Sequence, residues 1–350
     1  MNILFIINHL NAGGAEKILT ILANRFSKKN LKISIAKVSH DEPFYPLEKK
    51  INILHIVDQN YKPLDLIFGI KNIVSKIHPD IIISFGTTMN VYSIIASKFS
   101  SVPVIVSEHT NFHRAKNELW RKLRRIFYPF TDMLVVLTEY DHKMYNYVRN
   151  VKHIYNPLEL NSKYMDIKRE KIILSVGRLH KVKGFDLLLK AFSGINNSEW
   201  KLLILGDGPE RSNLELLAQD LKIDKRVSMP GTVKDIELYY KKASIFVLSS
   251  RTEGFPGALC EAMGYGCPSI AFDCITGPNE IINNNFDGIL VEPENVKELI
   301  RQIKDLQCNP EKRIQLGENG KKIIERLNAD TITNKWLDHI KSIINQCDLK

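Results

Sequence analysis

Long apolar stretches are missing from this sequence. None approaches the roughly 20 consecutive apolar residues that a membrane-spanning helix needs. The first residues, MNILFIINHLNAGG, lack the basic leader and the small-residue cleavage site of a secretory signal. We therefore expect a protein that stays in the cytoplasm and carries no spanning helix.

Cysteine is also scarce, and its pattern excludes two further classes of protein. The chain has five cysteines, an odd number without the paired close spacing of a zinc site: Cys260, Cys267, Cys274, Cys308 and Cys347. This usage is typical of a reducing compartment. The sequence predicts no disulfide, no structural metal and no bound cofactor. Internal repeats of about 20 to 50 residues and low-complexity tracts are absent too.

The glycine fingerprint of dinucleotide-binding enzymes is missing as well. Asn11, Ala12, Gly13 and Gly14 join the first predicted strand to the first predicted helix, but they do not form G-x-G-x-x-G. No acidic ribose partner follows the first helix, which argues against a nicotinamide dehydrogenase. The paired glycines allow either close approach of a ligand to the helix start or a tight turn without a ligand.

The chain has a strong excess of positive charge. Its 350 residues include 49 basic and 39 acidic residues, a net charge of +10, within an ordinary globular composition of 44% hydrophobic and 25% charged residues. This length suffices for two domains, each with its own core. The charge indicates an acidic partner: nucleic acid, an anionic membrane or a phosphorylated substrate.

Much of the basic charge lies in one segment, HRAKNELWRKLRRIFYPF. It interleaves six basic residues with apolar ones: Arg114, Lys116, Arg121, Lys122, Arg124 and Arg125. A helix here would place a basic side next to an apolar side, as in helices that lie on anionic lipid. Packing of the apolar stripe against the domain core is the alternative, and both can hold together. No nucleic-acid recognition motif accompanies the charge.

Strands and helices alternate along the chain, which predicts an α/β fold with doubly wound parallel sheets. In the first half we expect strands at 2–7, 31–38, 52–57, 81–85, 103–107, 133–137 and 153–155. In the second half we expect them at 171–176, 201–206, 226–230, 244–249, 268–272 and 288–291. The polar connector NPLELNSKYMDIKRE places the domain boundary around residue 162. After residue 310 the pattern is purely helical.

Two cations occupy the loop after the strand in KIILSVGRLHKVKGFDLLLKAF. Arg178 and Lys183 project from a glycine-bounded loop at the carboxyl end of that strand, the edge where ligands of parallel α/β sheets bind. Arg binds phosphate through two parallel hydrogen bonds and Lys binds it as a point charge, so the two residues predict a phosphate clamp. Solvated loop cations are the alternative.

A second motif lies in SSRTEGFPGALCEAMGYGCPSIAFD. Glu253 comes before a helix, the chain turns through Gly254, Phe255 and Pro256, and Glu261 lies about one turn inside the helix. Proline suits the first helical turn, which would leave the amides of Gly257 and Ala258 as an anion site. A helix with one acidic cap and one solvated Glu is the alternative.

Three features resemble those of glycosyltransferase family 4, over nearly the whole chain: the GRLHKVKG loop, the two glutamates with seven residues between them and the order of elements. That resemblance implies the GT-B fold, two facing Rossmann-like domains with a central cleft. Residues 1–162 would bind the acceptor, 163–327 the nucleotide sugar, and a helix at about 328–346 would cross back to the first domain. It also implies a retaining transferase without a bound metal.

The resemblance further implies roles for single residues. Arg178 and Lys183 would hold the donor diphosphate, Glu261 the ribose and Glu253 the transferred sugar. Four other positions would contact donor or sugar: Gly14, His109, Gly206 and Val233. We take His109 and Glu253 as the catalytic candidates, and Gly254, Phe255, Pro256, Gly257 and Ala258 as donor-binding.

A narrower resemblance concerns SEHTN, the basic segment and the dipeptide Tyr128-Pro129. These are similar to bacterial family members that add N-acetylgalactosamine or galactose to undecaprenyl-diphosphate-linked oligosaccharides. The resemblance implies a UDP-sugar donor and a lipid-linked acceptor in surface-polysaccharide assembly, at the inner face of the cell membrane. Arg121, Arg124 and Arg125 would hold the lipid diphosphate. There are two alternatives. The first is a family member that uses another nucleotide sugar and a soluble acceptor, and the second is a basic nucleic-acid-binding protein.

Overall fold

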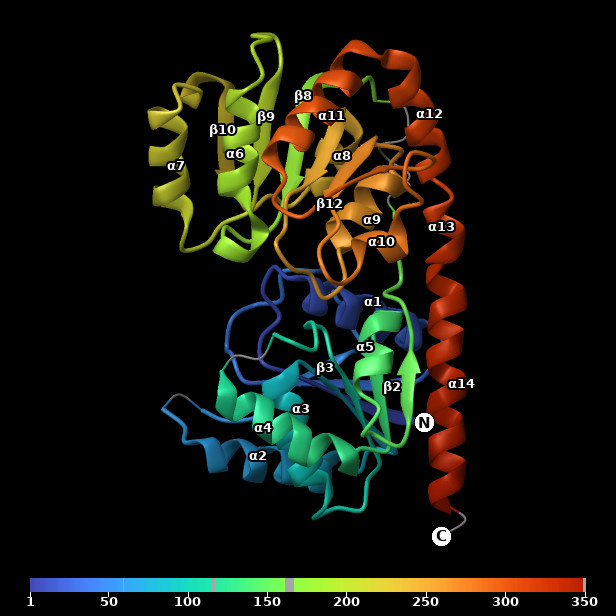
Figure 1. Cartoon of the computed structure of the whole chain (residues 1–350). Coiled ribbons are helices and arrows are strands. Elements are labelled where there is room, and N and C mark those ends of the chain that lie inside the picture. Colours follow the sequence, from blue (N-terminus) through green and yellow to red (C-terminus); the bar gives the residue numbers. More distant parts are fainter. Residues whose placement is uncertain (59, 115–116, 161–166, 349–350) are drawn as a thin grey trace. The chain divides into compact units, whose positions relative to one another are not determined.

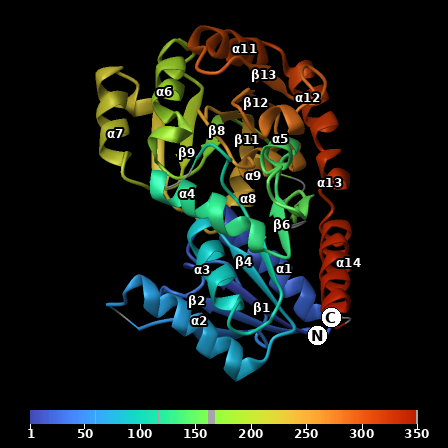
Figure 2. The same ribbon diagram turned by 60° about the horizontal axis from the view of Figure 1, so that its bottom comes forward.

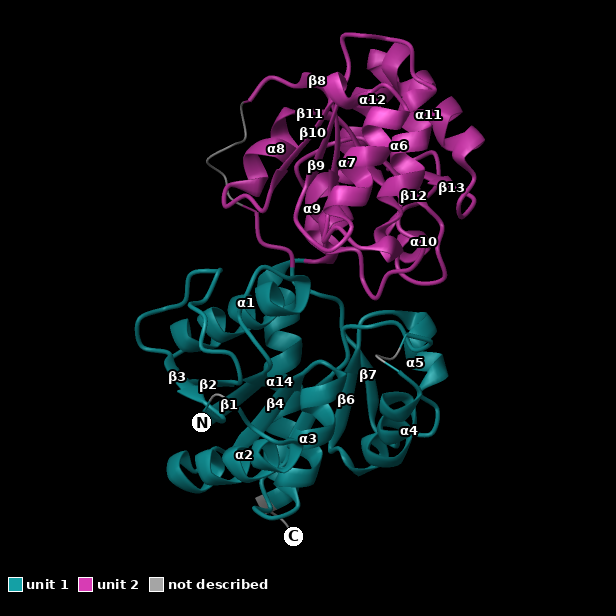
Figure 3. Cartoon of the chain, turned by 90° about the vertical axis from the view of Figure 1, so that its left-hand side faces the viewer, with its two compact units in different colours: residues 1–157, 328–350 teal, residues 158–327 magenta. Residues whose placement is uncertain are grey.

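The computed structural model describes residues 1–58, 60–114, 117–160 and 167–348. Two compact units make up the chain, one of residues 1–157 with 328–350 and the other of residues 158–327 (Figure 3). The division therefore falls after Pro157 and after Leu327, and the last helix belongs to unit 1. The boundary expected around residue 162, like Lys116, lies outside the described residues.

Unit 1 contains a seven-stranded parallel sheet in the order β3-β2-β1-β4-β5-β6-β7 (Figure 1). The strands are β1 Asn2–Ile7, β2 Lys32–Lys37, β3 Asn52–His55, β4 Ile81–Phe85, β5 Val104–Ser107, β6 Met133–Val136 and β7 Val151–His153. The helices are α1 Gly14–Lys28, α2 Pro63–Ile77, α3 Thr87–Ser97, α4 Glu118–Phe127, α5 Glu139–Met144 and α14 Ala329–Asp348, and a 3-10 turn η1 spans Tyr128–Phe130.

Alternation along the strands of unit 1 buries apolar residues on both faces of its sheet. Leu4 and Ile6 of β1 share a core cluster with Ile70 of α2. Phe5 points to the opposite face, where its ring stacks on Phe26 of α1 at 6.1 Å. α2, α3 and α4 lie next to one another, whereas α1 packs on α14 (Figure 2).

Unit 2 contains a six-stranded parallel sheet in the order β10-β9-β8-β11-β12-β13. Its strands are β8 Glu170–Val176, β9 Lys201–Leu205, β10 Val227–Gly231, β11 Ala243–Leu248, β12 Ser269–Phe272 and β13 Ile289–Val291. Its helices are α6 Phe185–Ser193, α7 Arg211–Asp220, α8 Ile236–Lys242, α9 Gly257–Gly264, α10 Pro278–Ile281, α11 Val296–Cys308, α12 Pro310–Gly320 and α13 Ile323–Arg326, with 3-10 turns η3 Lys181–Lys183 and η4 Asp224–Arg226.

Each sheet reverses its strand order once. In unit 1 the reversal lies between β1 and β4, and in unit 2 it lies between β8 and β11. In open parallel sheets, ligands bind outside the carboxyl ends of the strands at this switch point. The loops that follow β8 and β11 are therefore where a site in unit 2 is expected. No helix in the described part of the chain has the length and apolarity to cross a bilayer.

Candidate active site

The loops after β8 and β11 are fastened to each other through their backbones. The amide of Arg251 donates to the carbonyl of Val182 at 2.8 Å, and the Ser249 hydroxyl donates to the carbonyl of Lys183 at 3.0 Å. Gly184 has φ +63°, and a Cβ atom there would lie 2.0 Å from the Ser249 carbonyl oxygen. Only glycine allows this approach, which brings the two loops of the switch point together.

Lys183 and Glu253 meet at this junction, although 70 residues separate them. The Lys183 ammonium lies 2.7 Å and 2.9 Å from the two oxygens of the Glu253 carboxylate. Glu253 is only 6% exposed and Lys183 24%. A carboxylate this buried requires a partner charge and hydrogen bonds, and the lysine supplies the charge. The two site predictions thus coincide in one ion pair.

Two hydroxyl groups that we did not predict complete the environment of Glu253. Ser250 donates to the carboxylate at 2.5 Å. Thr276, from the loop after β12, donates to the backbone carbonyl of Glu253. Ser250 lies three residues before the glutamate, a spacing that is visible in the sequence, whereas Thr276 is placed by the sheet topology alone.

A second ion pair braces the loop after β11. The guanidinium of Arg251 binds Asp186 in a bidentate arrangement, with both distances 2.8 Å, and it also donates to the carbonyl of Lys181 at 2.8 Å. This contact holds the pKa of the Asp186 carboxyl below its ordinary value. Arg251 therefore ties the loop of Glu253 to the start of α6.

Arg178 differs from Lys183 in its surroundings. Its side chain is exposed, and within the described ranges it has no ion pair or hydrogen-bond partner. It follows Gly177, whose carbonyl oxygen lies close to Gly206. A Cβ atom at Gly206, where φ is +132°, would lie 2.1 Å from that oxygen. The Gly206 amide donates to the carbonyl of Gly231 at 2.9 Å, so Gly206 has a packing role at the ends of β8, β9 and β10. Val233 lies half-buried in the next connection.

The start of α9 differs from the prediction in one respect. Pro256 is the residue that precedes the helix, rather than a member of its first turn. The amide of Gly257 donates to the carbonyl of Phe255 at 2.9 Å, so the expectation that this amide is available to an anion is wrong. The Ala258 amide has no acceptor within the described residues.

Open space surrounds the beginning of α9. A Cβ atom at Gly257 would meet nothing within 4 Å. Gly254 and Phe255 are half-buried, and so is Glu261, one turn inside the helix. The Ala258 amide at the start of this eight-residue helix provides partial positive charge for an anion.

His109 follows β5 in unit 1. Its Nε2 lies 3.0 Å from the Ser107 hydroxyl, and its ring stacks on Phe85 with the centroids 5.1 Å apart. Burial lowers the pKa of the His109 imidazole to about 4. The imidazole is therefore neutral at pH 7 and suited to hydrogen bonding rather than to carrying charge.

Glu108, next to the histidine, is a buried carboxylate whose importance the sequence did not reveal. It accepts hydrogen bonds from Tyr128 at 2.6 Å, Thr87 at 2.8 Å and the Thr110 hydroxyl at 2.6 Å. Burial and the Glu108 charge raise the pKa of Tyr128 well above its ordinary value. These bonds fix the loop that carries His109.

The turn before α1 has the open character expected of a ligand contact. Gly14 begins the helix, and a Cβ atom there would meet nothing within 4 Å. The carboxylate of Glu16 lies against Gly13, and burial raises the pKa of this carboxyl. Gly14 thus leaves room for a ligand at the carboxyl edge of the sheet.

The basic helix α4 corrects one prediction. Arg121 and Arg125 are exposed, with Arg121 bound to Glu118 at 2.5 Å and Arg125 5.7 Å from the Tyr147 ring. Arg124 is buried instead, donates to the carbonyl of Phe112 and lies over the rings of Phe112 and Tyr145. It lies on the apolar side of the helix, so the role predicted for Arg124 in holding a lipid diphosphate is wrong.

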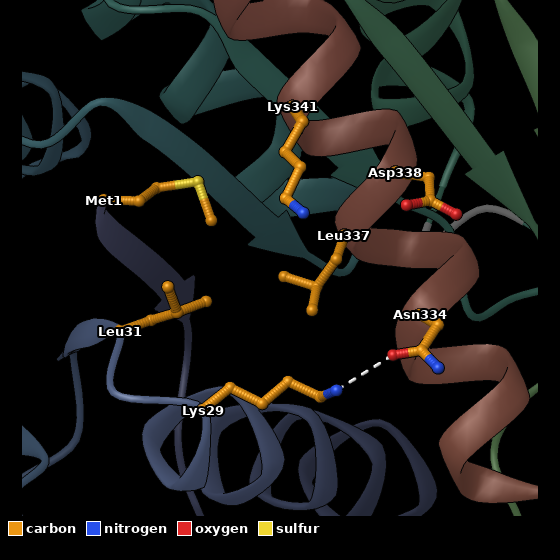
Figure 4. A pocket seen from close by; sticks show the side chains of 7 residues that line it. All are labelled: Met1, Lys29, Leu31, Asn334, Leu337, Asp338 and Lys341. Carbon is orange, nitrogen blue, oxygen red and sulfur yellow. Dashed lines mark hydrogen bonds between the residues drawn. The ribbon is translucent and has the colours of Figure 1, made fainter.

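A surface hollow of about 240 Å³ lies elsewhere in unit 1, between α14 and the segments before β1 and β2 (Figure 4). Its lining includes Met1, Leu31 and Leu337, and Lys29 donates to Asn334 at 3.0 Å. Met1 and Leu31 precede their strands, so the hollow marks the amino edge of the sheet. It is a packing feature of α14 at the edge of the unit 1 sheet opposite to the edge where Gly14 and His109 lie.

Comparison with known proteins shows the family of the chain. Residues 159–323 match the family model "Glycosyl transferases group 1", and residues 12–161 match "Glycosyltransferase Family 4". An uncharacterized glycosyltransferase of Haemophilus influenzae is 31% identical over 343 residues, covering 95% of this chain and 97% of the relative.

A second relative comes from Campylobacter jejuni. It is the GalNAc-alpha-(1->4)-GalNAc-alpha-(1->3)-diNAcBac-PP-undecaprenol alpha-1,4-N-acetyl-D-galactosaminyltransferase, 31% identical over 360 residues that cover 99% of each chain.

Solved structures share the fold. Sucrose-phosphate synthase of Thermosynechococcus elongatus superposes with a TM-score of 0.88 at 18% identity, covering 99% of both chains. HepE of Anabaena in complex with UDP and glucose gives a TM-score of 0.82 at 18% identity, covering 98% of this chain and 100% of the other. The fold is GT-B, and with full-length relatives at 31% identity the chain belongs to glycosyltransferase family 4.

Proposed function

We propose that the protein transfers an N-acetylhexosamine or hexose, GalNAc or galactose as the first choice, from a UDP-sugar to a lipid-linked saccharide, with retention of configuration. The name of the Campylobacter jejuni relative states such a transfer, onto an undecaprenol-linked glycan. A second Campylobacter jejuni relative, 25% identical, is also named as an N-acetylgalactosaminyltransferase acting on a diphospho-undecaprenol substrate. Surface-polysaccharide or glycan assembly is the corresponding process.

The ion pair of Lys183 and Glu253 at the switch point of unit 2 carries this proposal. The lysine ammonium bonds both oxygens of a buried carboxylate, and it is itself partly exposed. A donor diphosphate at this edge would share the ammonium with Glu253. The exposed guanidinium of Arg178 and the free amide of Ala258 would bind further phosphate oxygens.

These groups supply what the departure of UDP requires. Negative charge develops on the diphosphate as the glycosidic bond breaks, and fixed cations with an oriented amide stabilise that charge. The chain's own residues supply this charge stabilisation, so we propose that no bound metal or other cofactor is needed. Glu253, held by Lys183 and Ser250, orients the transferred sugar, and Glu261 accepts hydrogen bonds from the ribose hydroxyls.

His109 serves the reacting sugar as a neutral hydrogen-bonding group. Its low pKa keeps the imidazole uncharged over the physiological range. A neutral ring donates from one nitrogen and accepts at the other, and so it positions hydroxyl groups. In retention, the acceptor hydroxyl attacks from the face that UDP leaves.

The acceptor side of the proposal uses the exposed arginines of α4. Arg121 and Arg125 point to solvent, and guanidinium groups bind diphosphate in a bidentate manner. We propose that they contact the lipid diphosphate and anionic head groups at the inner face of the cell membrane. Nucleic acid is not a partner in this proposal.

Donor hydrolysis by the purified protein tests the central claim. UDP release is measured with a panel of UDP-sugars, with and without EDTA, and the anomeric configuration of the product is read by NMR. We expect one or two sugars to be hydrolysed, no loss with EDTA, and a free sugar that is released as the α anomer from an α-linked donor, read before it mutarotates. Absence of UDP release from every sugar, or an inverted product, would contradict the proposal.

A further inference from the structure

Unit 1 carries a group of exposed apolar side chains that neither its core nor the proposed site uses. Each member is more than half exposed: Leu64 and Phe68 on α2, Phe99 after α3, Leu119 and Ile126 on α4, and Phe130 in η1. Single exposed apolar residues are common on proteins, whereas a contiguous group marks an interaction surface. We call this group, with the lysines described next, the outer helical face.

Lysines lie next to two of the aromatic rings of the outer helical face. The Lys71 ammonium on α2 lies 5.5 Å from the Phe99 ring. The Lys98 ammonium lies 5.8 Å from the Phe130 ring. Phe68 lies three residues before Lys71 on the same side of α2, and α2, α3 and α4 lie side by side (Figure 2). Two lysine–ring contacts thus connect α2 with Phe99 and the end of α3 with Phe130 of η1.

Positive charge accompanies this apolar surface. Between residues 61 and 130 the sequence has ten basic and four acidic residues. All four acids are engaged: Asp65 caps α2, Asp80 accepts from the Asn2 amide, Glu108 is buried and Glu118 binds Arg121. Among the exposed cations, Lys122 lies between Leu119 and Ile126 on the same side of α4. The surface is therefore apolar and cationic together.

We propose that the outer helical face docks on an anionic lipid bilayer, with its rings and aliphatic side chains among the acyl chains and its lysines at the level of the phosphates. This arrangement of apolar anchors within a ring of basic residues is how proteins bind reversibly to a membrane interface. Two such faces from two copies of the chain would oppose like charges, and a nucleic acid would leave the exposed rings without partners. The inference deepens the membrane partner of the proposed function and rests on it to that extent.

Vesicle binding by the full chain tests this docking directly. Co-sedimentation is measured with vesicles of phosphatidylcholine alone and with added phosphatidylglycerol, over a range of salt concentrations. We expect binding to the anionic vesicles only, weakened but not abolished by salt, because burial of apolar groups does not depend on ionic strength. Binding that salt abolishes completely would show a purely electrostatic contact and overturn the insertion.

Tryptophan fluorescence reports the depth of insertion. The chain has three tryptophans, of which Trp200 and Trp336 are buried, while Trp120 on α4 is half-exposed and stacks edge-on against Tyr92. Quenching by phospholipids brominated on the acyl chains therefore reports on α4. We expect quenching in anionic vesicles, and its absence would contradict insertion of this helix.

Matched variants assign the binding to these side chains. Phe99→Ser combined with Ile126→Ser should lower the vesicle partition coefficient by at least about tenfold. Leu216→Ser combined with Ile314→Ser removes two equally exposed apolar residues from unit 2 and should leave it unchanged. An equal loss of vesicle binding in both pairs of variants, or no loss in either, would overturn the proposal. It would also be overturned if the wild type were a dimer in solution and the first pair of substitutions made it a monomer.

Donor hydrolysis separates this inference from the proposed function. Without vesicles, the Phe99→Ser, Ile126→Ser variant should release UDP at the wild-type rate, because neither residue belongs to the candidate site. A wild type that binds vesicles but hydrolyses no UDP-sugar would refute the transferase proposal and leave the docking surface intact. A wild type that hydrolyses donor but does not bind anionic vesicles would refute the docking surface and leave the transferase proposal intact.

Discussion

Glu253 carries its charge at a position that is 6% exposed, and Lys183 is the cation that makes this possible. Removing one partner of a buried pair leaves an uncompensated charge, which costs more than the pair contributes. Lys183 therefore has a structural role next to the role we propose for it in donor binding. Experiments that replace the lysine must separate the two.

A double-mutant cycle separates them. Lys183→Met should lower the free energy of unfolding by about 1 to 3 kcal/mol, because Glu253 loses its partner while Lys183 was partly solvated. Adding Glu253→Gln should restore part of that loss, giving a coupling of about 1 to 2 kcal/mol in urea denaturation. Donor hydrolysis should be lost in all three variants. Lys190→Met, an exposed lysine of α6, is the control; additive effects would argue against the pair.

His109 predicts a pH effect with a definite sign. Its folded-state pKa is about 4 against an ordinary value of 6.5, so the unfolded chain binds the extra proton first as pH falls. The contribution of His109 to the free energy of unfolding is complete above pH 6.5. It is lost as the pH falls from 6.5 to 4, by about 2 kcal/mol for a half-buried ring.

The measurement compares the wild type with His109→Gln by urea denaturation at several pH values. Other titrating groups are common to both proteins, so the difference between the two curves isolates His109. We expect that difference to change between pH 6.5 and 4 and to be flat above. A constant difference would mean that the imidazole stays accessible to protons.

At the level of the elements, glycines decide how closely the loops of unit 2 approach. Gly184 and Gly206 have positive φ and lie where a Cβ atom would come within about 2 Å of a carbonyl oxygen. Gly257, in contrast, begins α9 in open space. The same residue type thus allows close backbone packing at two positions and borders open space at the third.

Alanine substitutions distinguish these uses. Gly184→Ala should lower the free energy of unfolding by about 3 kcal/mol or more, because the new methyl group meets the Ser249 carbonyl in a left-handed conformation. Gly257→Ala should leave stability within about 0.5 kcal/mol or raise it, since alanine favours a helix. Thermal unfolding of both variants checks this, and equal losses would contradict it.

The sequence predicted the elements well because apolar runs of four to seven residues recur between turn residues. All thirteen strands of the described chain lie within a few residues of their expected positions. It also placed Lys183 and Glu253 at one edge of the same sheet. It could not reveal Ser250, Thr276 or the Arg251–Asp186 brace, since these contacts depend on which loops the topology brings together. Arg124 was misplaced because charge alone does not show which side of a helix is buried.

At the scale of the whole chain, the two units differ in how they are assembled. Unit 2 is the continuous segment 158–327, whereas unit 1 combines 1–157 with 328–350. The Leu158 amide donates to the Leu327 carbonyl at 2.8 Å, which joins the two ends of unit 2. α14 contributes Ile332, Trp336 and Ile340 to the buried residues of unit 1 and bonds Asp330 to Arg25 at 2.5 Å.

Truncated chains test this division. Residues 158–327 expressed alone should unfold cooperatively, because all strands and helices of unit 2 are present. Residues 1–157 alone should lack cooperative unfolding, because the apolar surface that α14 covers would be exposed to water. Circular dichroism on heating distinguishes the outcomes, and adding a peptide of residues 328–350 should restore a transition to 1–157. A sharp transition of 1–157 by itself would contradict the prediction.

The return of α14 to unit 1 has a consequence for biosynthesis. Domains generally fold as units while the ribosome elongates the chain, the amino-terminal one first. Here the sheet of unit 1 emerges early but needs residues 328–350, which follow unit 2 in the chain, whereas residues 158–327 are complete before them. Unit 2 should therefore reach its native state first, and a nascent chain that stops after residue 327 would hold one folded unit and one unit that lacks its last helix.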